Sequence, residues 1–574
     1  MNKKVSFFAM ALSMLMLFTA VVPATVAIGN TGNFTAGSFL GAGPGLYGPI
    51  LVEVHMSSPT RIDQVRVLSH DETHNTGNIP LELYPSLIVE NQSLQIDIVA
   101  GATISSMAML SAVRDAITRA GADPAVFTGR VTPYVPHTNT SADVVVIGAG
   151  GAGMTAAIHA AYEGVNVILL EKLGFVGGTT NYVIEAFGSV GNRTHLALGS
   201  PLNAETLTQT LITNNPNGSP EALSILAHNN GWAADWLRSI GAMMTVAGGQ
   251  AAVQASREVG EIGPAMVSAL RDEALHQGVD IRVNSRATGI ITNASGAITG
   301  VRVQTPLGDY TINTSSVVVA TGGFAANLEM VTEHRPDLEG FRYASSPGNR
   351  GDGHMMAQAM GANLGNMDHI RINYVYSTTP NQYFYYVASI VNTGAIVVNY
   401  AGERFMNDQA GHGQGPAMLA QGGSGWMVFD NTIVGSVREV RRLSNVEGLF
   451  VTANSLEELA QVTGINQAGL LNTIERYQGF VANGVDEDFN RPMLNMTFEK
   501  GPFHAVHLGL RVQGTFGGIT TDTSARVLTP QGSVIPGLFA AGEVADDGTW
   551  GANPAAVNIV FGRIAGQEAA AFVR

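Results

Sequence analysis

The sequence contains no cysteine among its 574 residues. This absence excludes disulfides, cysteine-ligated iron–sulfur clusters, haem attached through a Cys-x-x-Cys-His motif, and a lipid anchor on an N-terminal cysteine. Any electron transfer by this chain therefore has to use cofactors that do not depend on cysteine. We assign no metal-ligating residues.

Charged residues are also scarce, and one sign dominates. They make up 13% of the chain, and 45 acidic residues outnumber 30 basic ones, which gives a net charge of −15 at pH 7. An acidic chain repels a phosphate backbone, so we expect no nucleic-acid partner. The chain is too long for a single hydrophobic core, and we expect roughly three or four domains.

Residues 1–27 have the features of a secretory signal segment. Lys3 and Lys4 form its basic end, residues 5–22 are apolar, and Ala27 fits a cleavage site. The alternative is an uncleaved anchor, because the apolar run approaches the length that spans a bilayer. In both cases we expect the rest of the chain to lie outside the cytoplasm.

A dinucleotide-binding pattern occupies residues 143–172. An apolar strand leads into a glycine-rich turn, an alanine-rich helix follows, and a second apolar strand ends in an acid. The glycines permit a tight turn close to a pyrophosphate, the helix N-terminus attracts its charge, and the acid accepts ribose hydroxyls. The residues of the turn and the acid are Gly148, Gly150, Gly151, Ala152, Gly153 and Glu171.

Three later segments support the same domain. Residues 317–323 form an apolar strand that ends in a glycine turn, and residues 537–544 form a strand, a turn and an acid, Glu543. The run Gly551-Ala-Asn553-Pro554 then opens a helix. Strands that end in glycine turns are typical of an α/β domain that binds a nucleotide at the carboxyl ends of its strands.

Together these motifs resemble the FAD domain of the fumarate reductase and urocanate reductase flavoproteins, over roughly residues 142–574. The resemblance implies a Rossmann-like α/β domain (residues 142–367 and 513–574) with an inserted α+β capping domain (residues 368–512). It implies non-covalent FAD, with contacts from Lys172, Gly178, Thr179, Thr180, Ala287, Asp352, Glu543, Asn553 and Ala555 as well as from the glycine turn and Glu171. For Asp352, a surface turn is the alternative.

Residues 38–121 are predicted to form a separate small α+β domain. Two stretches alternate apolar and polar residues as strands do, and an amphipathic helix follows the turn Gly101-Ala-Thr103. Such a turn at a helix N-terminus would hold a phosphate, and a simple turn with an N-cap is the alternative. Residues 122–141 are rich in proline and threonine and are predicted to be a semi-extended linker.

This small domain resembles the FMN-binding domain of respiratory flavoproteins. The resemblance rests on Gly48-Pro49, on residues 70–73, and on Asp97 followed by Gly-Ala-Thr103. It implies FMN bound covalently at Thr103 through a phosphoester, attached by a flavin transferase outside the cytoplasm. Ala100 stands where the family usually has serine or threonine.

The capping domain departs from the fumarate reductases where those enzymes bind a dicarboxylate. Residues 394–408 match them closely, but the expected histidines and arginines are replaced. Where the family has Gln-x-His-Pro, this chain has Arg371 and Asn373 in place of the glutamine and the histidine, and Gly514 replaces a further histidine. Ala388 and Val391 replace the residues of the proton relay, and His412 replaces the proton-donating arginine. The segment Asn553-Pro554 lacks the carboxylate-binding arginine. Because arginine binds a carboxylate with paired hydrogen bonds, we expect fumarate to be a poor substrate.

Aromatic residues gather in the same part of the chain, namely Tyr374, Tyr376, Tyr383, Phe384, Tyr385, Tyr386 and Trp550. Such a lining suits a flat, largely apolar substrate, and packing between domains is the alternative. The catalytic candidates are His412, Tyr383, Tyr385 and Arg371. For His412, an exposed loop histidine is the alternative.

The sequence thus predicts a secreted oxidoreductase, as in anaerobic respiration, with an external electron donor. Electrons would pass from FMN to FAD and then to the activated C=C bond of an enoate or enone that is aromatic or extended. One alternative is a flavin ketosteroid dehydrogenase or reductase, although the Tyr-Pro-Gly usual in that family is absent near the C-terminus. Another is a flavin electron carrier without catalysis.

Overall fold

The computed structural model divides into two compact units, which are described one at a time. The first comprises the chain up to Glu72 together with Gly77–Pro133, and the second contains Tyr134–Arg574. The described residues are 34–46, 48–72, 77–99, 102–132, 134, 136–183, 189–199, 202–242, 244–247, 250–253, 262–378, 381–383, 387–409, 414–436, 440, 448–495, 498–549 and 552–574. For residues 244–247, 250–253, 375–376, 381–383, 387–389 and 436 this covers the backbone only.

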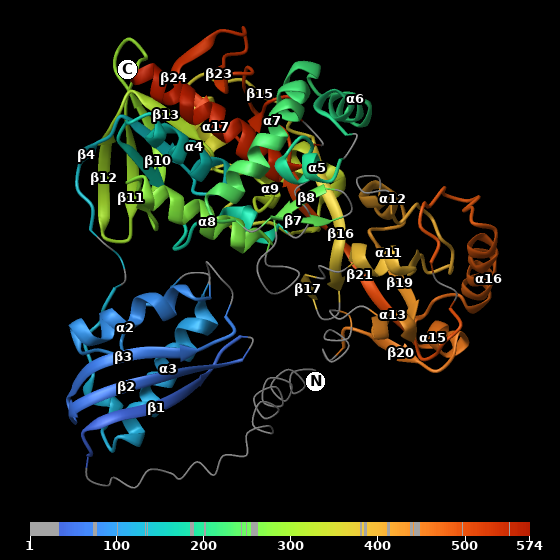
Figure 1. The fold of residues 1–574 in the computed structure, drawn as a ribbon, viewed down its shortest axis with the longest axis horizontal. Coiled ribbons are helices and arrows are strands. Elements are labelled where there is room, and N and C mark those ends of the chain that lie inside the picture. The colour runs from blue at the N-terminus through green and yellow to red at the C-terminus, as the bar shows by residue number, and fades with distance from the viewer. Residues whose placement is uncertain are drawn as a thin grey trace, which may run out of the picture. The chain divides into compact units, whose positions relative to one another are not determined.

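The first unit is an antiparallel sheet covered by helices (blue and cyan in Figure 1). Its strand β2 alternates, with Ile50, Val52, Val54 and Met56 buried between exposed neighbours, because one face of the sheet packs on the helices and the other meets water. The elements are β1 (Gly37–Pro44), β2 (Pro49–Ser58), β3 (Arg61–Ser69), α2 (Ile79–Asn91), α3 (Thr103–Arg119) and η2 (Pro124–Val126).

The structure shortens the predicted linker at both ends. Phe127 is buried in the core of the first unit, and its carbonyl accepts a hydrogen bond of 3.1 Å from the Leu94 N–H. At the other end, β4 (Thr140–Ser141) pairs in parallel with β12 (Gly308–Asn313) of the second unit. The composition indicated an extended segment, but its apolar side chains and backbone groups find partners in the two units.

A six-stranded sheet forms the centre of the second unit. Five of its strands are parallel, and alternate side chains enter two cores: Val144 and Val146 pack against helices, whereas Val145 and Ile147 face a second, mostly antiparallel sheet. Strands buried on both faces read as continuous apolar runs, which is why the sequence marked them clearly. In sheet order they are β23 (Arg526–Leu528), β24 (Val534–Ala540), β13 (Ser316–Val319), β5 (Val144–Ile147), β6 (Val167–Leu170) and β9 (Asp280–Arg282).

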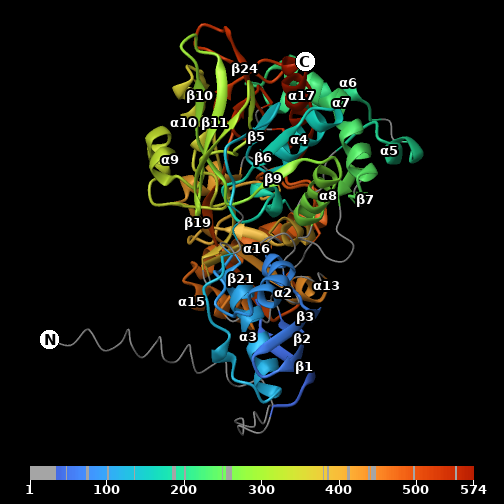
Figure 2. The same ribbon diagram turned by 90° about the vertical axis from the view of Figure 1, so that its left-hand side faces the viewer.

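Helices and the antiparallel sheet cover the two faces of this central sheet (Figure 2). The covering helices are α4 (Gly151–Tyr162), α7 (Pro220–Ser239), α8 (Ile262–His276) and α17 (Pro554–Val573), and the opposing sheet is β10 (Arg286–Thr292), β11 (Ile298–Thr305), β12 and β4. The smaller elements are η3 (Gly178–Tyr182), α5 (Arg193–Ala197), α6 (Ala204–Asn214), β7 (Met244–Ala247), β8 (Gln250–Val253), α9 (Leu328–His334), η4 (Pro336–Leu338), β14 (Arg342–Tyr343), α10 (Asp352–Ala359), β15 (Leu364–Gly365), β22 (Gly518–Thr520) and β25 (Ala545–Asp546).

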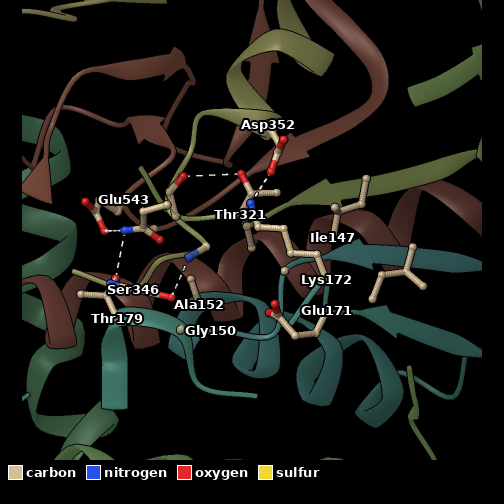
Figure 3. A pocket seen from close by; sticks show the side chains of 18 of the residues that line it. Ile147, Gly150, Ala152, Glu171, Lys172, Thr179, Thr321, Ser346, Asp352 and Glu543 are labelled. Carbon is tan, nitrogen blue, oxygen red and sulfur yellow. Dashed lines mark hydrogen bonds and ion pairs between the residues drawn. The ribbon is translucent and has the colours of Figure 1, made fainter. Parts of the chain in front are cut away.

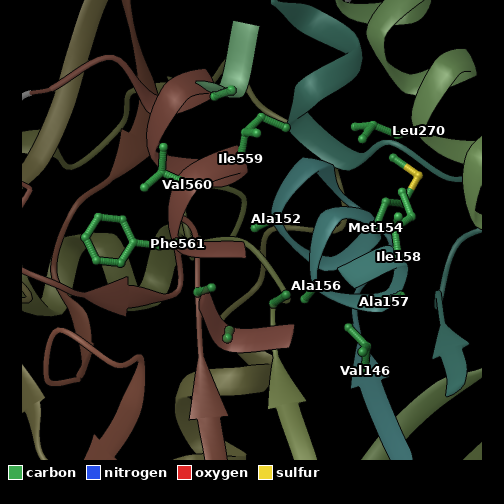
Figure 4. Close-up of a cluster of buried hydrophobic side chains, with 14 of the residues drawn as sticks. Val146, Ala152, Met154, Ala156, Ala157, Ile158, Leu270, Ile559, Val560 and Phe561 are labelled. Atoms are coloured by element: carbon green, nitrogen blue, oxygen red, sulfur yellow. The ribbon is translucent and has the colours of Figure 1, made fainter. Parts of the chain in front are cut away.

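Helices α4 and α17 pack unusually closely (Figure 4). A Cβ on Gly562 would lie 2.6 Å from the Ala152 carbonyl oxygen, and one on Gly566 would lie 2.1 Å from that of Ala156. Only glycine allows this approach. The packing places the start of α17, near the C-terminus of the chain, beside the glycine turn that follows β5.

The capping domain is built on one mixed sheet and joins the FAD domain at the ends of two strands. Its core contains residues from β16, β18, β19 and β21, together with α15 and α16. The elements are β16 (Ile370–Thr378), β17 (Asn381–Tyr383), α11 (Val387–Thr393), β18 (Ile396–Val398), α12 (Gln414–Ala420), β19 (Ser424–Asp430), α13 (Asn431–Ser436), β20 (Val451–Ala453), α15 (Leu456–Thr463), α16 (Gln467–Asn483) and β21 (Phe503–Thr515).

Within the described part of the chain, none of the helices combines the length and apolar character needed to cross a membrane.

Candidate functional site

A cavity of about 730 Å³ opens where four parallel strands end (Figure 3). Its wall is formed by the residues that follow β5, β6, β13 and β24, which is where α/β sheets bind nucleotides. Of the predicted FAD contacts, those that line this cavity are Gly148, Gly150, Gly151, Ala152, Glu171, Lys172, Gly178, Thr179, Thr180, Ala287, Asp352 and Glu543. We call it the dinucleotide cavity.

The glycines of this turn leave space for a ligand and allow α4 to pack close to the turn. Gly148 has φ +104°, a conformation that favours glycine. Gly153 is absent from the wall, because its role is to let α4 approach the turn: a Cβ there would lie 1.8 Å from the Gly148 carbonyl oxygen. The N-terminus of α4 begins at Gly151 with a glycine as N-cap, so a dinucleotide phosphate fits in front of it.

Glu171 is positioned by the backbone. Its two carboxylate oxygens accept hydrogen bonds from the Ala149 N–H (3.1 Å) and the Leu173 N–H (2.8 Å). Burial raises the pKa of Glu171, and these two N–H groups oppose that shift. A carboxylate oxygen accepts more than one hydrogen bond, so Glu171 has capacity left for ribose hydroxyls in the dinucleotide cavity.

A charged group closes another side of the dinucleotide cavity. Asp352 forms ion pairs with Lys172 and, at 2.7 Å, with Arg286. Burial acts to raise the pKa of Asp352, but hydrogen bonds and charge from Lys172 and Arg286 outweigh it, and the pKa is lowered. Asp352 is therefore ionised at neutral pH, and it belongs to the site rather than to a separate surface turn.

Glu543 lies on the walls of two neighbouring cavities. Its carboxylate accepts hydrogen bonds from the Thr515 N–H (2.9 Å) and the Asn349 side-chain amide (3.0 Å), and that amide also donates to the Thr179 hydroxyl (2.9 Å). Burial raises the pKa of Glu543 to about 7, despite these donors. Asn349 was not foreseen from the sequence, since nothing in its local pattern marks it.

We expect Glu543→Gln to stabilise the FAD-free protein in a pH-dependent way. The folded protein holds the Glu543 proton up to a pKa of about 7 against an ordinary 4.5, so this group's contribution to stability is lost as pH rises through that window. As pH rises from 4.5 to about 7, the free energy of unfolding of the variant, relative to that of wild type, should rise by about 3 kcal/mol. Urea unfolding at several pH values measures this difference.

The control is Glu339→Gln, which changes an exposed acid. It measures the effect of removing one exposed negative charge over the same pH range, and the rise seen with Glu543→Gln should exceed that effect. A constant difference between Glu543→Gln and wild type across the same window would contradict the raised pKa.

The second cavity, of about 1280 Å³, adjoins the first and shares Thr179, Thr180, Gly542, Glu543 and Asn558 with it. We call it the substrate cavity. The capping sheet contributes Arg371 and Asn373 from β16, and Gln513 and Gly514 from β21, which runs past the predicted domain boundary at residue 512. The Asn373 amide donates to the Gln513 side-chain oxygen at 3.2 Å. The FAD domain contributes the remaining wall: Tyr182, Val183, Ala344, Phe516, Ala545, Asp547, Thr549, Ala552, Asn553, Pro554, Ala555 and Val557.

The positions at which the sequence departs from fumarate reductases meet in this substrate cavity. Four of these positions line the cavity although they come from three distant segments of the chain: Arg371, Asn373, Gly514 and Pro554. Asn553 and Ala555, predicted as FAD contacts, also lie here, at the N-terminus of α17. The side chains missed from the sequence include Gln513, Phe516 and Asp547, which lack a motif of their own.

The predicted aromatic lining is wrong for Tyr374. Its side chain is buried in the capping domain, and its hydroxyl donates to the Asp408 carbonyl at 3.1 Å. The reason is strand alternation: Arg371 and Asn373 share the cavity face of β16, and Tyr374 takes the opposite face. Tyr383 lies on β17 without a described side chain, and His412, Phe384, Tyr385, Tyr386 and Trp550 lie outside the described residues.

In the first unit, the motifs predicted to bind FMN come together. Thr103 is exposed and begins α3, whose N-cap residue is Ala102, so no capping side chain competes for a phosphate. Glu72 accepts hydrogen bonds from the Leu46 N–H (2.6 Å) and the Ser105 hydroxyl. The segments near residues 46, 72 and 103 therefore lie close together around the start of α3.

Comparison with known proteins agrees with both sites. Residues 143–560 match the FAD binding domain family, and residues 45–118 match the FMN-binding domain family. A urocanate reductase of Eggerthella lenta is 32% identical over 567 residues, covering 93% of this chain and 92% of that protein. A fumarate reductase (cytochrome) of Shewanella frigidimarina is 33% identical, covering 76% of this chain and 78% of that protein.

Among solved structures, the open conformation of a flavocytochrome c3 fumarate reductase superposes with a TM-score of 0.65 at 31% identity, covering 76% of this chain and 79% of that one. The chain belongs to the fumarate and urocanate reductase-like flavoprotein family, and it is an FAD- and FMN-dependent oxidoreductase that acts on CH–CH groups.

Proposed function

We propose that this enzyme reduces the activated C=C bond of an enoate with a single carboxylate and an aromatic or extended group, rather than fumarate. The observation that carries the proposal is the charge of the substrate cavity. Among the described residues that line it, Arg371 is the one cationic side chain. A second carboxylate would face Glu543, Asp547 and neutral groups.

Arg371 is well placed to bind a carboxylate. It lies on β16 opposite Gly514 of β21, so the neighbouring strand adds no side chain at that point. A guanidinium binds a carboxylate with two parallel hydrogen bonds, which fixes the orientation of the substrate as well as its affinity. The amides of Asn373 and Gln513 border the same region.

The remaining walls favour a larger apolar group. Tyr182, Val183, Phe516, Pro554 and Val557 supply aromatic and aliphatic surface, which suits an apolar substituent better than a second carboxylate. Where the resemblance implies a carboxylate-binding arginine, the chain has Pro554. Burying an unpaired carboxylate against such a surface is expensive, which supports discrimination against fumarate.

The chemistry needs a hydride and a proton. FAD, when bound in the dinucleotide cavity, supplies the hydride. The chain supplies the proton, and we propose His412 as its donor, with Tyr383 and Tyr385 as alternatives. A histidine can donate a proton near neutral pH without a relay, which is consistent with Ala388 and Val391 replacing the relay residues.

The cellular setting is part of the proposal. The N-terminal basic and apolar residues support export, and Thr103 on an exposed helix start supports covalent attachment of FMN by a flavin transferase outside the cytoplasm. FMN would receive electrons from an external donor and pass them to FAD. Together these features describe an extracytoplasmic respiratory reductase.

The proposal is tested with a panel of acceptors and a reduced dye as donor. We expect an aryl enoate such as cinnamate to be turned over with a kcat/KM at least about 100-fold above that of fumarate, the equivalent of two lost charge-assisted hydrogen bonds. Equal or better turnover of fumarate would overturn the proposal. Turnover of a steroid enone above every enoate would favour the ketosteroid alternative.

A further inference from the structure

Asp547 is one of the residues that line the substrate cavity, and the reaction proposed above does not use its carboxylate. It follows β25, and its Oδ1 accepts two hydrogen bonds from Thr549, from the N–H at 2.9 Å and from the hydroxyl at 2.6 Å. The loop is tied down further by a hydrogen bond of 2.7 Å from the Ser219 N–H to the Gly548 carbonyl. The carboxylate is therefore held in one orientation.

Its other oxygen, Oδ2, is buried and has no hydrogen-bond partner within the described part of the chain. An unsatisfied buried acceptor costs about 1–3 kcal/mol, and more when it is charged, so such a group calls for an explanation. Burial, with a contribution from the neighbouring Asp546, raises the pKa of Asp547 to about 6. At neutral pH the group is therefore ionised and acts only as an acceptor.

The other acid of this cavity, Glu543, differs from Asp547 because both of its oxygens have a partner in the protein. Each oxygen of Glu543 accepts a hydrogen bond, from the Thr515 N–H and from the Asn349 amide. Arg371, the cation of the cavity, comes from the capping domain, whereas Asp547 comes from the FAD domain. The cavity thus has a cationic wall and an anionic wall on different domains, and a substrate between them would be oriented by both.

We infer that Asp547 is a specificity-determining residue that accepts a hydrogen bond from an O–H or N–H group on the end of the substrate remote from its carboxylate. The inference rests on the proposed function, in which Arg371 binds the carboxylate, and it narrows the substrate class to enoates whose aromatic or extended end carries a donor, such as a phenol. A cavity built to receive such a donor rejects the analogue that lacks it, because its acceptor is then left unpaired.

The experiment compares 3- and 4-hydroxycinnamate with cinnamate in the holoenzyme, with a reduced dye as donor. Wild type should prefer the better hydroxycinnamate by about 10- to 100-fold in kcat/KM, the range expected for a hydrogen bond to a charged group. Asp547→Asn keeps the Oδ1 acceptor for Thr549 and replaces only Oδ2 by an N–H₂ group. In this variant the ratio of kcat/KM between the hydroxycinnamate and cinnamate should fall to about onefold.

The matched control is Asp546→Asn, which removes the same charge one residue away, where the side chain accepts from Asn366 at 2.9 Å and does not line the cavity. It should keep the preference of wild type. FAD content confirms that each variant is folded, and Asp547→Ala is the second variant if Asp547→Asn loses FAD.

Binding of the reduced products, followed through flavin absorbance, separates this inference from the proposed function. A hydroxyl-dependent affinity that disappears in Asp547→Asn supports the inference even if none of the three enoates is turned over, in which case the proposed function alone has failed. A wild-type enzyme without the hydroxyl preference in either measurement, or an Asp547→Asn variant that retains it, would overturn the inference.

Discussion

Arg371→Met is expected to lower kcat/KM for an enoate by about 10²- to 10⁴-fold, chiefly through a higher KM. The paired hydrogen bonds between a guanidinium and a carboxylate are each worth about 1.5–3 kcal/mol, and their loss leaves the substrate carboxylate without a cation on the described wall of the cavity. Steady-state kinetics with a reduced dye measures the change, and FAD content should stay that of wild type, because Arg371 does not line the dinucleotide cavity.

Two further variants sharpen this result. Arg371→Lys keeps the charge but loses the paired geometry, so it should recover only part of the lost kcat/KM. Arg342→Met changes an exposed arginine on β14 that does not line the substrate cavity, and it should behave as wild type. If Arg371→Met bound and reduced the enoate normally, the assignment of the carboxylate to this residue would be wrong.

Thr103→Ala is expected to abolish incorporation of FMN in protein exported from a host that has the flavin transferase. The hydroxyl of Thr103 is the acceptor for the proposed phosphoester, and alanine has none. Mass spectrometry should show one FMN adduct on the wild-type protein and none on the variant. Turnover with the physiological type of donor should be lost, whereas a dye that reduces FAD directly should still support it.

Thr118→Ala provides the control for Thr103→Ala. Thr118 lies on the same helix, α3, is exposed, and donates its hydroxyl hydrogen only to the Arg114 carbonyl at 2.9 Å, one turn earlier. Its FMN adduct should be intact, and both variants should retain FAD. A normal adduct in Thr103→Ala would show that the attachment residue lies elsewhere.

Local patterns were sufficient to predict the dinucleotide cavity. Strands such as β5 are buried on both faces, so they appear as short apolar runs, and the glycines after them are needed by the turn itself. Glu171 was found because it directly follows β6, and Glu543 because it ends the glycine turn after β24. The ends of parallel strands at one edge of a sheet converge on the ligand. The order of these motifs along the chain was enough to predict a Rossmann-like fold and FAD.

The substrate cavity could be predicted only in part. Counting along the chain showed that Arg371, Asn373, Gly514 and Pro554 replace residues of the fumarate reductases, but not that Arg371 faces the cavity while Tyr374 turns away from it. Alternation along β16 puts Arg371 and Asn373 on one face and Tyr374 on the other, but which face meets the cavity depends on how β16 packs in the capping domain.

The sequence by itself determined the two flavin domains. Glycine turns, apolar strands and the Gly-Ala-Thr103 turn are each formed by neighbouring residues, so they can be recognised along the chain without knowledge of the tertiary structure. The tertiary structure alone decided which acids are buried and which cation faces them. Glu543 accepts hydrogen bonds from Asn349 and Thr515, which lie far from it in sequence, and burial raises the pKa of Glu543 and of Asp547. Burial and long-range pairing depend on which surfaces are packed together, and a local pattern carries no information about them.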